Sequence, residues 1–159
     1  MMKINLYRLI VVVGMTLALV APVMPAWASP AGQDVIYFDK AYNPAESAAA
    51  NTAVFTGIVY GDVVGSLKST RLDYRTVDDG TIVLVTFKWE IRDTDLGDGD
   101  QSFTAVASGT LNNANGKVVM NGEVVDGYLL GAKFIEEGQL VDAATLRFRG
   151  SMKLVKNSG

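Results

Sequence analysis

Residues 81–93 read Thr-Ile-Val-Leu-Val-Thr-Phe-Lys-Trp-Glu-Ile-Arg-Asp and decide the fold class. The odd-numbered side chains from Val83 to Ile91 are all apolar, whereas the even-numbered ones become polar after Leu84. Because successive side chains of a β-strand point to opposite faces, this alternation predicts one long strand with a single apolar face. That face carries Phe87 and Trp89 and needs a covering layer.

Three later segments alternate in the same way. Their apolar faces comprise Phe103, Ala105, Ala107, Gly109 and Leu111 in the first segment, Tyr128, Leu130, Ala132, Phe134 and Leu140 in the second, and Leu146, Phe148, Gly150, Met152 and Leu154 in the third. The pairs Asp79-Gly80, Asp98-Gly99, Asn115-Gly116 and Asp126-Gly127 fall between the expected strands. Such pairs suit the positive φ of tight hairpins, so the chain from residue 54 onward is predicted to be an antiparallel meander of about eight strands.

Continuous hairpin connections favour a single closed antiparallel barrel over a sandwich, since closure removes exposed sheet edges. A barrel of about eight strands is either filled or encloses one small ligand. The small inward residues leave room beside large ones, so we predict a ligand site lined by Phe87, Trp89, Phe103, Tyr128 and Phe134. The alternative is a solid interior, in which the small residues accommodate their large neighbours.

Residues 1–28 have the organisation of a cleaved signal peptide. A basic start is followed by an apolar run and by a small-x-small pattern that ends at Ala28. An uncleaved anchor is the alternative, but Pro22 and Pro25 would break a helix just before the cleavage site. We expect a bacterial protein that is secreted or periplasmic, with no stable membrane insertion after cleavage. Residues 29–53 are predicted to form a linker, with a possible first strand at 34–39 followed by a loop over 40–52 or a short helix from Pro44. Residues 54–159 are predicted to form the barrel.

Composition excludes several classes of chemistry. The 159 residues include neither cysteine nor histidine, so disulfides, thiol nucleophiles, serine–histidine triads and histidine- or cysteine-bound metals are excluded. The predicted signal removes two of the 14 basic and none of the 17 acidic side chains, which leaves a net charge of −5. This charge disfavours nucleic acid and anionic membranes as partners. We expect no cofactor, and the sequence is compatible with an oligomer.

Glu136 is the candidate catalytic residue. It is in phase with Tyr128 and Phe134, which predicts an inward carboxylate that could act as a general acid or hold a polar group of a ligand. The alternative is a bulge at Gly138, or a position at the barrel rim, that leaves Glu136 in water, and we favour it because buried unpaired carboxylates are rare. The neighbouring Glu137 is expected on the outer surface, in an ion pair with Arg147 or Arg149.

Two charged segments are interpreted as solvated surface. Residues 93–100 contain four aspartates, and oxygen ligands suit calcium, but the spacing does not match a helix-loop-helix calcium loop. We therefore predict an acidic hairpin tip and no metal site. Arg71, Asp73 and Arg75 share one face of a strand expected over residues 67–76, and we predict that this face lies outside the barrel.

The glycine spacing resembles that of allene-oxide-cyclase-like and dirigent-like barrels of the calycin type. The motifs that carry the resemblance are GIVYGDVVG at residues 57–65, Gly109-Thr110-Leu111, GEVVDG at 122–127 with Gly131-Ala132, and Phe148-Arg149-Gly150. It covers about 100 residues, from 54 to 155, and implies an eight-stranded barrel with an interior cavity for an apolar or phenolic molecule. The family includes cyclases, coupling-guidance proteins and bacterial proteins of no known activity.

The favoured function is that of a non-catalytic exported barrel that binds a small apolar or aromatic molecule in its interior. One alternative is a cofactor-free cyclase or isomerase in which Glu136 or Tyr128 assists proton transfer, and another is an interaction protein of the cell envelope. Whether the protein is an enzyme stays open at this stage, because a fold does not determine an activity.

Overall fold

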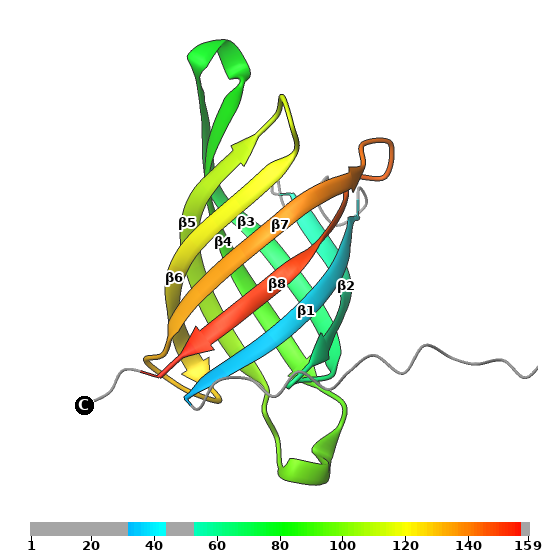
Figure 1. Cartoon of the computed structure of the whole chain (residues 1–159), viewed down its shortest axis with the longest axis vertical. Coiled ribbons are helices and arrows are strands. Elements are labelled where there is room, and N and C mark those ends of the chain that lie inside the picture. The colour runs from blue at the N-terminus through cyan, green and yellow to red at the C-terminus, as the bar shows by residue number, and fades with distance from the viewer. Residues whose placement is uncertain (1–31, 44–52, 157–159) are drawn as a thin grey trace, which may run out of the picture.

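Eight consecutive strands, each antiparallel to the next, form a closed barrel in the computed structural model, which describes residues 32–43 and 53–156 (Figure 1). The strands are β1 (Gln33–Tyr42), β2 (Val54–Gly61), β3 (Gly65–Val77), β4 (Ile82–Asp93), β5 (Phe103–Asn112), β6 (Lys117–Gly127), β7 (Lys133–Asp142) and β8 (Arg147–Val155). Two short 3-10 helices, η1 (Asp78–Gly80) and η2 (Leu96–Asp98), lie in the β3–β4 and β4–β5 connections. β8 pairs with β1, so the predicted closed barrel is confirmed. The predicted signal peptide lies outside the described residues.

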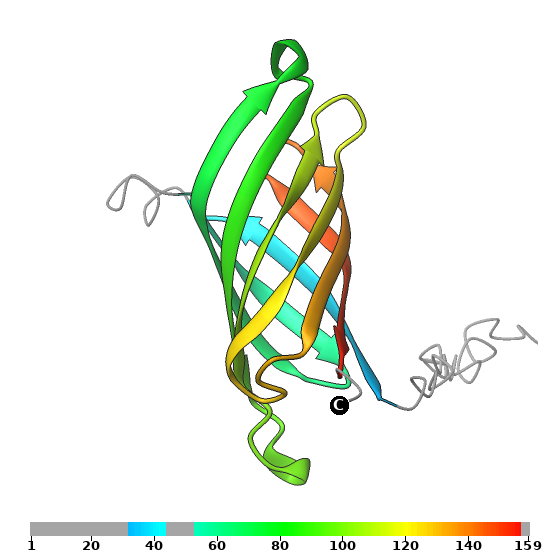
Figure 2. The same cartoon turned by 90° about the vertical axis from the view of Figure 1, so that its left-hand side faces the viewer.

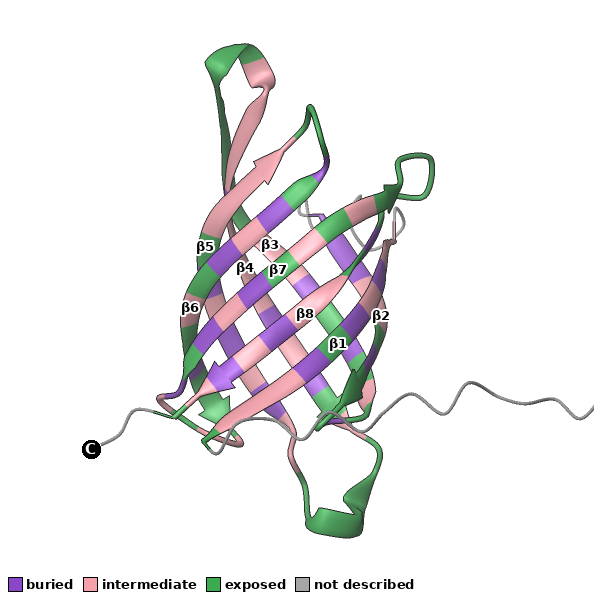
Figure 3. Ribbon diagram, viewed as in Figure 1, coloured by how far each residue is buried: buried purple, intermediate pink, exposed green. Residues whose placement is uncertain are grey.

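β4 forms where the alternating pattern predicts it, and its apolar face points into the barrel. Trp89 and Phe87 of β4 stand opposite Ala105 and Ala107 of β5. Large and small side chains therefore meet across the inner surface, which lets the rings cross the barrel. Figure 3 shows the resulting alternation of buried with more exposed residues along the strands.

The turns follow the predicted pairs. Gly80, Gly99 and Gly116 lie in the β3–β4, β4–β5 and β5–β6 connections with φ of 87°, 92° and 72°. Gly127 ends β6 with φ of 81°. In Figures 1 and 2 the β3–β4 hairpin and the β4–β5 connection project from opposite ends of the barrel. These two ends differ in how the interior is filled.

The barrel begins earlier in the chain than predicted. β1 pairs with β2 on one side and with β8 on the other, which confirms the possible first strand at 34–39 and makes residues 33–42 the closing strand of the barrel. The inward side chains of β1 are Ile36, Phe38 and Lys40, and all three are buried. The predicted loop is wrong at its start, because the strand continues through Lys40 to Tyr42. The remainder of that prediction, residues 44–52, lies outside the described residues.

Phe38 packs against a place where two strands carry no side chains. Gly138 of β7 and Gly150 of β8 are paired directly across the ladder. A Cβ atom added to Gly150 would lie 2.8 Å from Phe38 Cζ, and one added to Gly138 would lie 3.0 Å from the same atom. Both glycines are therefore required for the close approach of this ring to the barrel wall.

A bulge in β3 separates the three charged residues that were expected on one outer face. The register with β4 shifts between Arg71 and Asp73, which makes Leu72 the extra residue. A bulge of this kind reverses which side chains point inward. Arg71 precedes the bulge and faces the interior, in phase with the buried Leu67, whereas Asp73 and Arg75 follow the bulge and lie along an outer groove with residues of β4 and β5. The predicted exterior position is wrong for Arg71.

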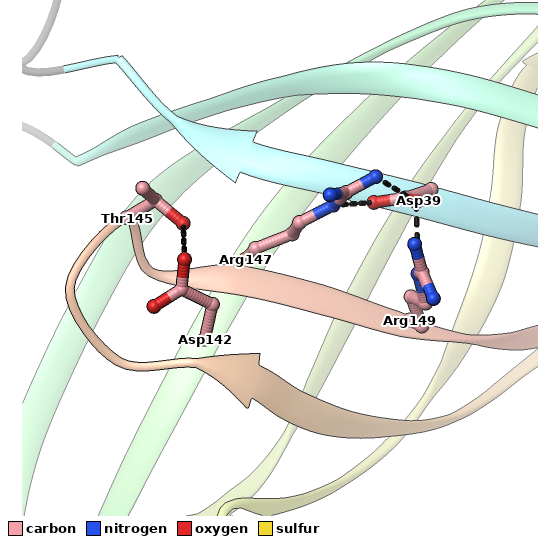
Figure 4. Close-up of polar contacts among 5 residues, drawn as sticks. All are labelled: Asp39, Asp142, Thr145, Arg147 and Arg149. Carbon is pink, nitrogen blue, oxygen red and sulfur yellow. Dashed lines mark hydrogen bonds and ion pairs between the residues drawn. The ribbon is translucent and has the colours of Figure 1, made fainter.

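On the outer surface, the predicted pairing of Glu137 with an arginine is also wrong. Glu137 stands opposite Ser151, and both arginines bond instead to Asp39 of β1 (Figure 4). Arg147 donates to the two carboxylate oxygens of Asp39 at 2.6 Å each, and Arg149 Nε donates to Oδ2 at 2.9 Å. The hydrogen bonds from Arg147 are the main reason that the pKa of Asp39 lies below its usual value. These bonds join the two strands that close the barrel.

Candidate functional site

A cavity of about 200 Å³ occupies the interior, and each of the eight strands contributes to its lining. Much of its wall is apolar and consists of Phe55, Val83, Val85, Leu111, Val118 and Phe148. For comparison, an engineered apolar protein cavity of about 150 Å³ binds benzene. The cavity is therefore large enough for one substituted aromatic ring.

The cavity extends from an exposed mouth to a buried floor. At the mouth, Tyr74 and Thr76 belong to the part of β3 beyond the bulge and are both exposed. The Arg71 guanidinium lies 4.2 Å from the centre of the Tyr74 ring, a cation–π contact. At the other end, Lys40, Trp89 and Glu136 are buried. A ligand would thus enter from the end of the barrel that carries the β3–β4 hairpin.

A salt bridge forms the floor. Lys40 Nζ donates to Glu136 Oε1 at 2.9 Å, and the two residues are 4% and 0% exposed. Four rings surround the ammonium group, with the centre of Phe38 at 4.7 Å, of Trp89 at 5.0 Å, and of Phe87 and Phe148 at 5.7 and 5.8 Å. Removing two charges from water is costly, and each charge here is stabilised by the other, while the ring faces stabilise the ammonium group in addition.

Two polar atoms at the floor have no hydrogen-bond partner within the described part of the chain. They are Glu136 Oε2, which can accept a hydrogen bond, and Trp89 Nε1, which can only donate one. Buried polar atoms are nearly always satisfied, because an unsatisfied one costs about 1–3 kcal/mol. Both atoms belong to residues of the cavity lining, which therefore carries one acceptor and one donor without a partner. The buried Ser69 Oγ is unpartnered in the same sense, but Ser69 does not line the cavity.

The predicted site residues divide into two groups. Phe87, Trp89 and Glu136 line the cavity. The expectation that Glu136 lies in water is wrong, because the β7–β8 register is regular at Gly138 and shifts only between Leu140 and Asp142. The predicted inward orientation, which was the less favoured alternative, is the one observed.

Phe103 and Phe134 are buried but do not line this cavity. Phe134 packs on the floor residue Trp89, with ring centres 5.1 Å apart, and so belongs to the filled end of the barrel. The interior is consequently solid at one end and hollow at the other, and each of the two sequence-based alternatives describes one part of it.

Tyr128 does not line the cavity either. The strand predicted from this residue begins only at Lys133, and the turn before it contains Leu129 and Gly131 with positive φ. Burial, and next a hydrogen bond to Asp34, raises the pKa of Tyr128 to about 12. Asp34 lies at the start of β1, so Tyr128 is at the barrel end opposite the cavity mouth.

Lys40 and Arg71 are the charged lining residues that the sequence analysis missed. Lys40 is in phase with the apolar Ile36 and Phe38, and this phase is a signal that could have placed it inside. A lysine is seldom buried without a partner, and its partner is 96 residues away in sequence. Arg71 was predicted to point outward together with Asp73 and Arg75, because the alternating pattern does not indicate the bulge at Leu72 that separates them.

Asp93, Asp95 and Asp100 of the acidic segment bond to the backbone of their own loop. Asp93 accepts hydrogen bonds from the amides of Asp95 and Gln101, each at 3.0 Å, and Asp100 accepts one from Ser102 at 2.9 Å. These carboxylates thus stabilise the turn that contains η2. Across residues 32–43 and 53–156, no three acidic side chains are placed to hold a metal ion together.

Comparisons of the chain with protein-family models, curated proteins and solved structures find no match. The resemblance to allene-oxide-cyclase-like and dirigent-like barrels therefore stays a prediction. In the part of the chain that the structure describes, no helix has the length and apolar character needed to cross a membrane.

Proposed function

We propose that this protein binds a small, largely apolar molecule with an aromatic ring inside its barrel. The observation that carries the proposal is the cavity of about 200 Å³, with apolar walls and a mouth at one barrel end. Its aromatic lining favours ring stacking and edge contacts, which add to the free energy of burial. A concave apolar site with a few polar groups is the usual form of a small-molecule site.

Calorimetry with a series of one-ring aromatic probes tests this function. Val85→Phe adds bulk on the cavity side of β4, whereas Leu84→Phe adds the same ring on the outer side of that strand. We expect Val85→Phe to abolish binding and Leu84→Phe to leave it unchanged. Failure of all probes to bind, or equal binding to both variants, would contradict an interior site.

We also propose that the protein is exported and that residues 1–28 are removed. The basic start, the apolar run and the small-x-small pattern support this step. N-terminal sequencing of the protein recovered from the periplasm or medium should then begin at Ser29. A chain that keeps its apolar segment and fractionates with membranes would instead indicate an uncleaved anchor.

A second candidate function is a cofactor-free cyclase or isomerase, and the observation that favours it is Glu136 Oε2 in the cavity lining. Tyr128, the other residue considered for proton transfer, is at the opposite barrel end, which is why binding is the preferred function. Turnover of a bound probe that stops in Lys40→Met/Glu136→Gln, while binding continues, would favour the enzyme.

A further inference from the structure

We propose that the cavity floor selects an uncharged hydroxyl group, so that the ligand is a one-ring alcohol and not an acid, an ether or a hydrocarbon. The hydroxyl would donate to Glu136 Oε2 and accept from Trp89 Nε1. This inference rests on the proposed binding function and adds to it the chemical class of the ligand.

The charges of the floor favour a neutral ligand. Lys40 and Glu136 compensate each other at 2.9 Å, so the floor has no net charge to offer. A ligand carboxylate would approach the open oxygen of Glu136 and be repelled by it. The other charged residue of the lining, Arg71, stacks on Tyr74 at the mouth and is not at the floor.

The open hydrogen-bonding atoms favour a hydroxyl among the neutral groups. Glu136 Oε2 needs a donor, and Trp89 Nε1 needs an acceptor. A hydroxyl is both, whereas an ether oxygen can only accept and a methyl group can do neither. Binding of an ether or a hydrocarbon would leave at least one buried polar atom unsatisfied, and this lowers affinity.

The two atoms belong to groups that lie around the same point. The Lys40 ammonium is 2.9 Å from Glu136 Oε1 and 5.0 Å from the centre of the Trp89 ring. The carboxylate and the indole therefore both neighbour one ammonium group. The apolar wall formed by Phe55, Val85 and Phe148 leaves space above the floor for the ring of the ligand.

Four probes of matched size separate these preferences: 2-phenylethanol, its methyl ether, n-propylbenzene and 3-phenylpropanoate. Calorimetry of the purified protein at neutral pH should show that 2-phenylethanol binds at least about tenfold more tightly than each of the others. Equal affinity for the alcohol and the ether would overturn the inference, and it would indicate that water satisfies the two atoms. Tighter binding of the acid would overturn it as well.

Two variants assign the preference to the floor. Trp89→Phe keeps a ring but removes the N–H, and Lys40→Met/Glu136→Met removes both charges together. In each variant the ratio of the propylbenzene to the phenylethanol dissociation constant should fall to about threefold or less. The outer-surface variant Leu84→Phe should keep the full ratio. If the double variant does not fold, Trp89→Phe alone decides, and an unchanged ratio in it would overturn the proposal.

Failure of this inference differs from failure of the proposed function. If propylbenzene and the alcohol bind equally and Val85→Phe abolishes both, the cavity binds apolar rings without recognising the hydroxyl. If none of the four probes binds, the binding function and the hydroxyl preference both fail.

Discussion

Replacing Glu136 by leucine should strongly destabilise the barrel, because it leaves the Lys40 ammonium buried without its counter-charge. At the observed 2.9 Å separation, the Coulomb attraction with an effective dielectric constant of about 20 is about 6 kcal/mol. Part of this attraction offsets the loss of hydration. The net cost of removing one partner from a buried pair is about 3–5 kcal/mol, a large share of the roughly 5–15 kcal/mol that stabilises a typical domain.

Urea unfolding at neutral pH measures this cost, and two variants serve as controls. Lys40→Met/Glu136→Leu removes both charges and should regain most of the lost stability, because an apolar replacement of a whole buried pair is often neutral. Glu137→Leu changes the exposed neighbour on the same strand and should alter the free energy of unfolding by about 0.5 kcal/mol or less. If Glu136→Leu were as stable as the wild type, or the double variant no more stable than the single one, the floor would not be a buried charge pair.

Four further predictions follow from the packing and the titrating groups. Trp89→Ala removes a fully buried ring and should cost about 3–5 kcal/mol in urea unfolding, and a cost below about 1 kcal/mol would contradict its packing role. Gly150→Ala places a methyl group against a phenyl ring and the neighbouring strand, so we expect a lower melting temperature and reduced amide protection in β8. Asp39→Asn should cost about 1 kcal/mol or less at neutral pH. The pKa of Asp39 in the folded wild type lies below 3.8, mainly because of Arg147, so the stability difference between wild type and Asp39→Asn should disappear as the pH falls through that pKa. A stability difference that persists in acid would argue against the ion pair. The pKa of Tyr128 is about 12 in the folded state, against 10 for an ordinary tyrosine, so the stability of the wild type should decline as the pH rises from 10 toward 12. Tyr128→Phe should lack this decline, and it should also lack the last step of tyrosine ionisation in an ultraviolet titration.

The closed barrel was predictable because its signals are local. The alternation in residues 81–93 predicts β4 to within one residue of its bounds, and the turn pairs predict the positions of the hairpins. Phe87 and Trp89 were placed correctly for the same reason, since period-two alternation fixes which side of a strand faces the core. The failures at Arg71 and Tyr128 are also local, because a bulge at Leu72 and a turn before Lys133 interrupt an alternation that continues in the sequence.

The salt bridge at the cavity floor could not be predicted in this way, because it depends on contacts between distant strands. Lys40 and Glu136 each appear unsuitable for an interior when considered alone, and each becomes acceptable only beside the other. Their proximity follows from barrel closure, which brings β1 next to β8 and β8 next to β7. A pair of opposite charges, each in phase with inward apolar residues, is the pattern that would indicate such a site.

A crystal structure of the protein with bound 2-phenylethanol tests the account most directly. We predict density for the ring inside the barrel, among the side chains of β4 and β8, with the hydroxyl oxygen about 3 Å from both Glu136 Oε2 and Trp89 Nε1. Density for the probe only on the outer surface, or an interior closed by side chains with Lys40 and Glu136 apart, would contradict the account.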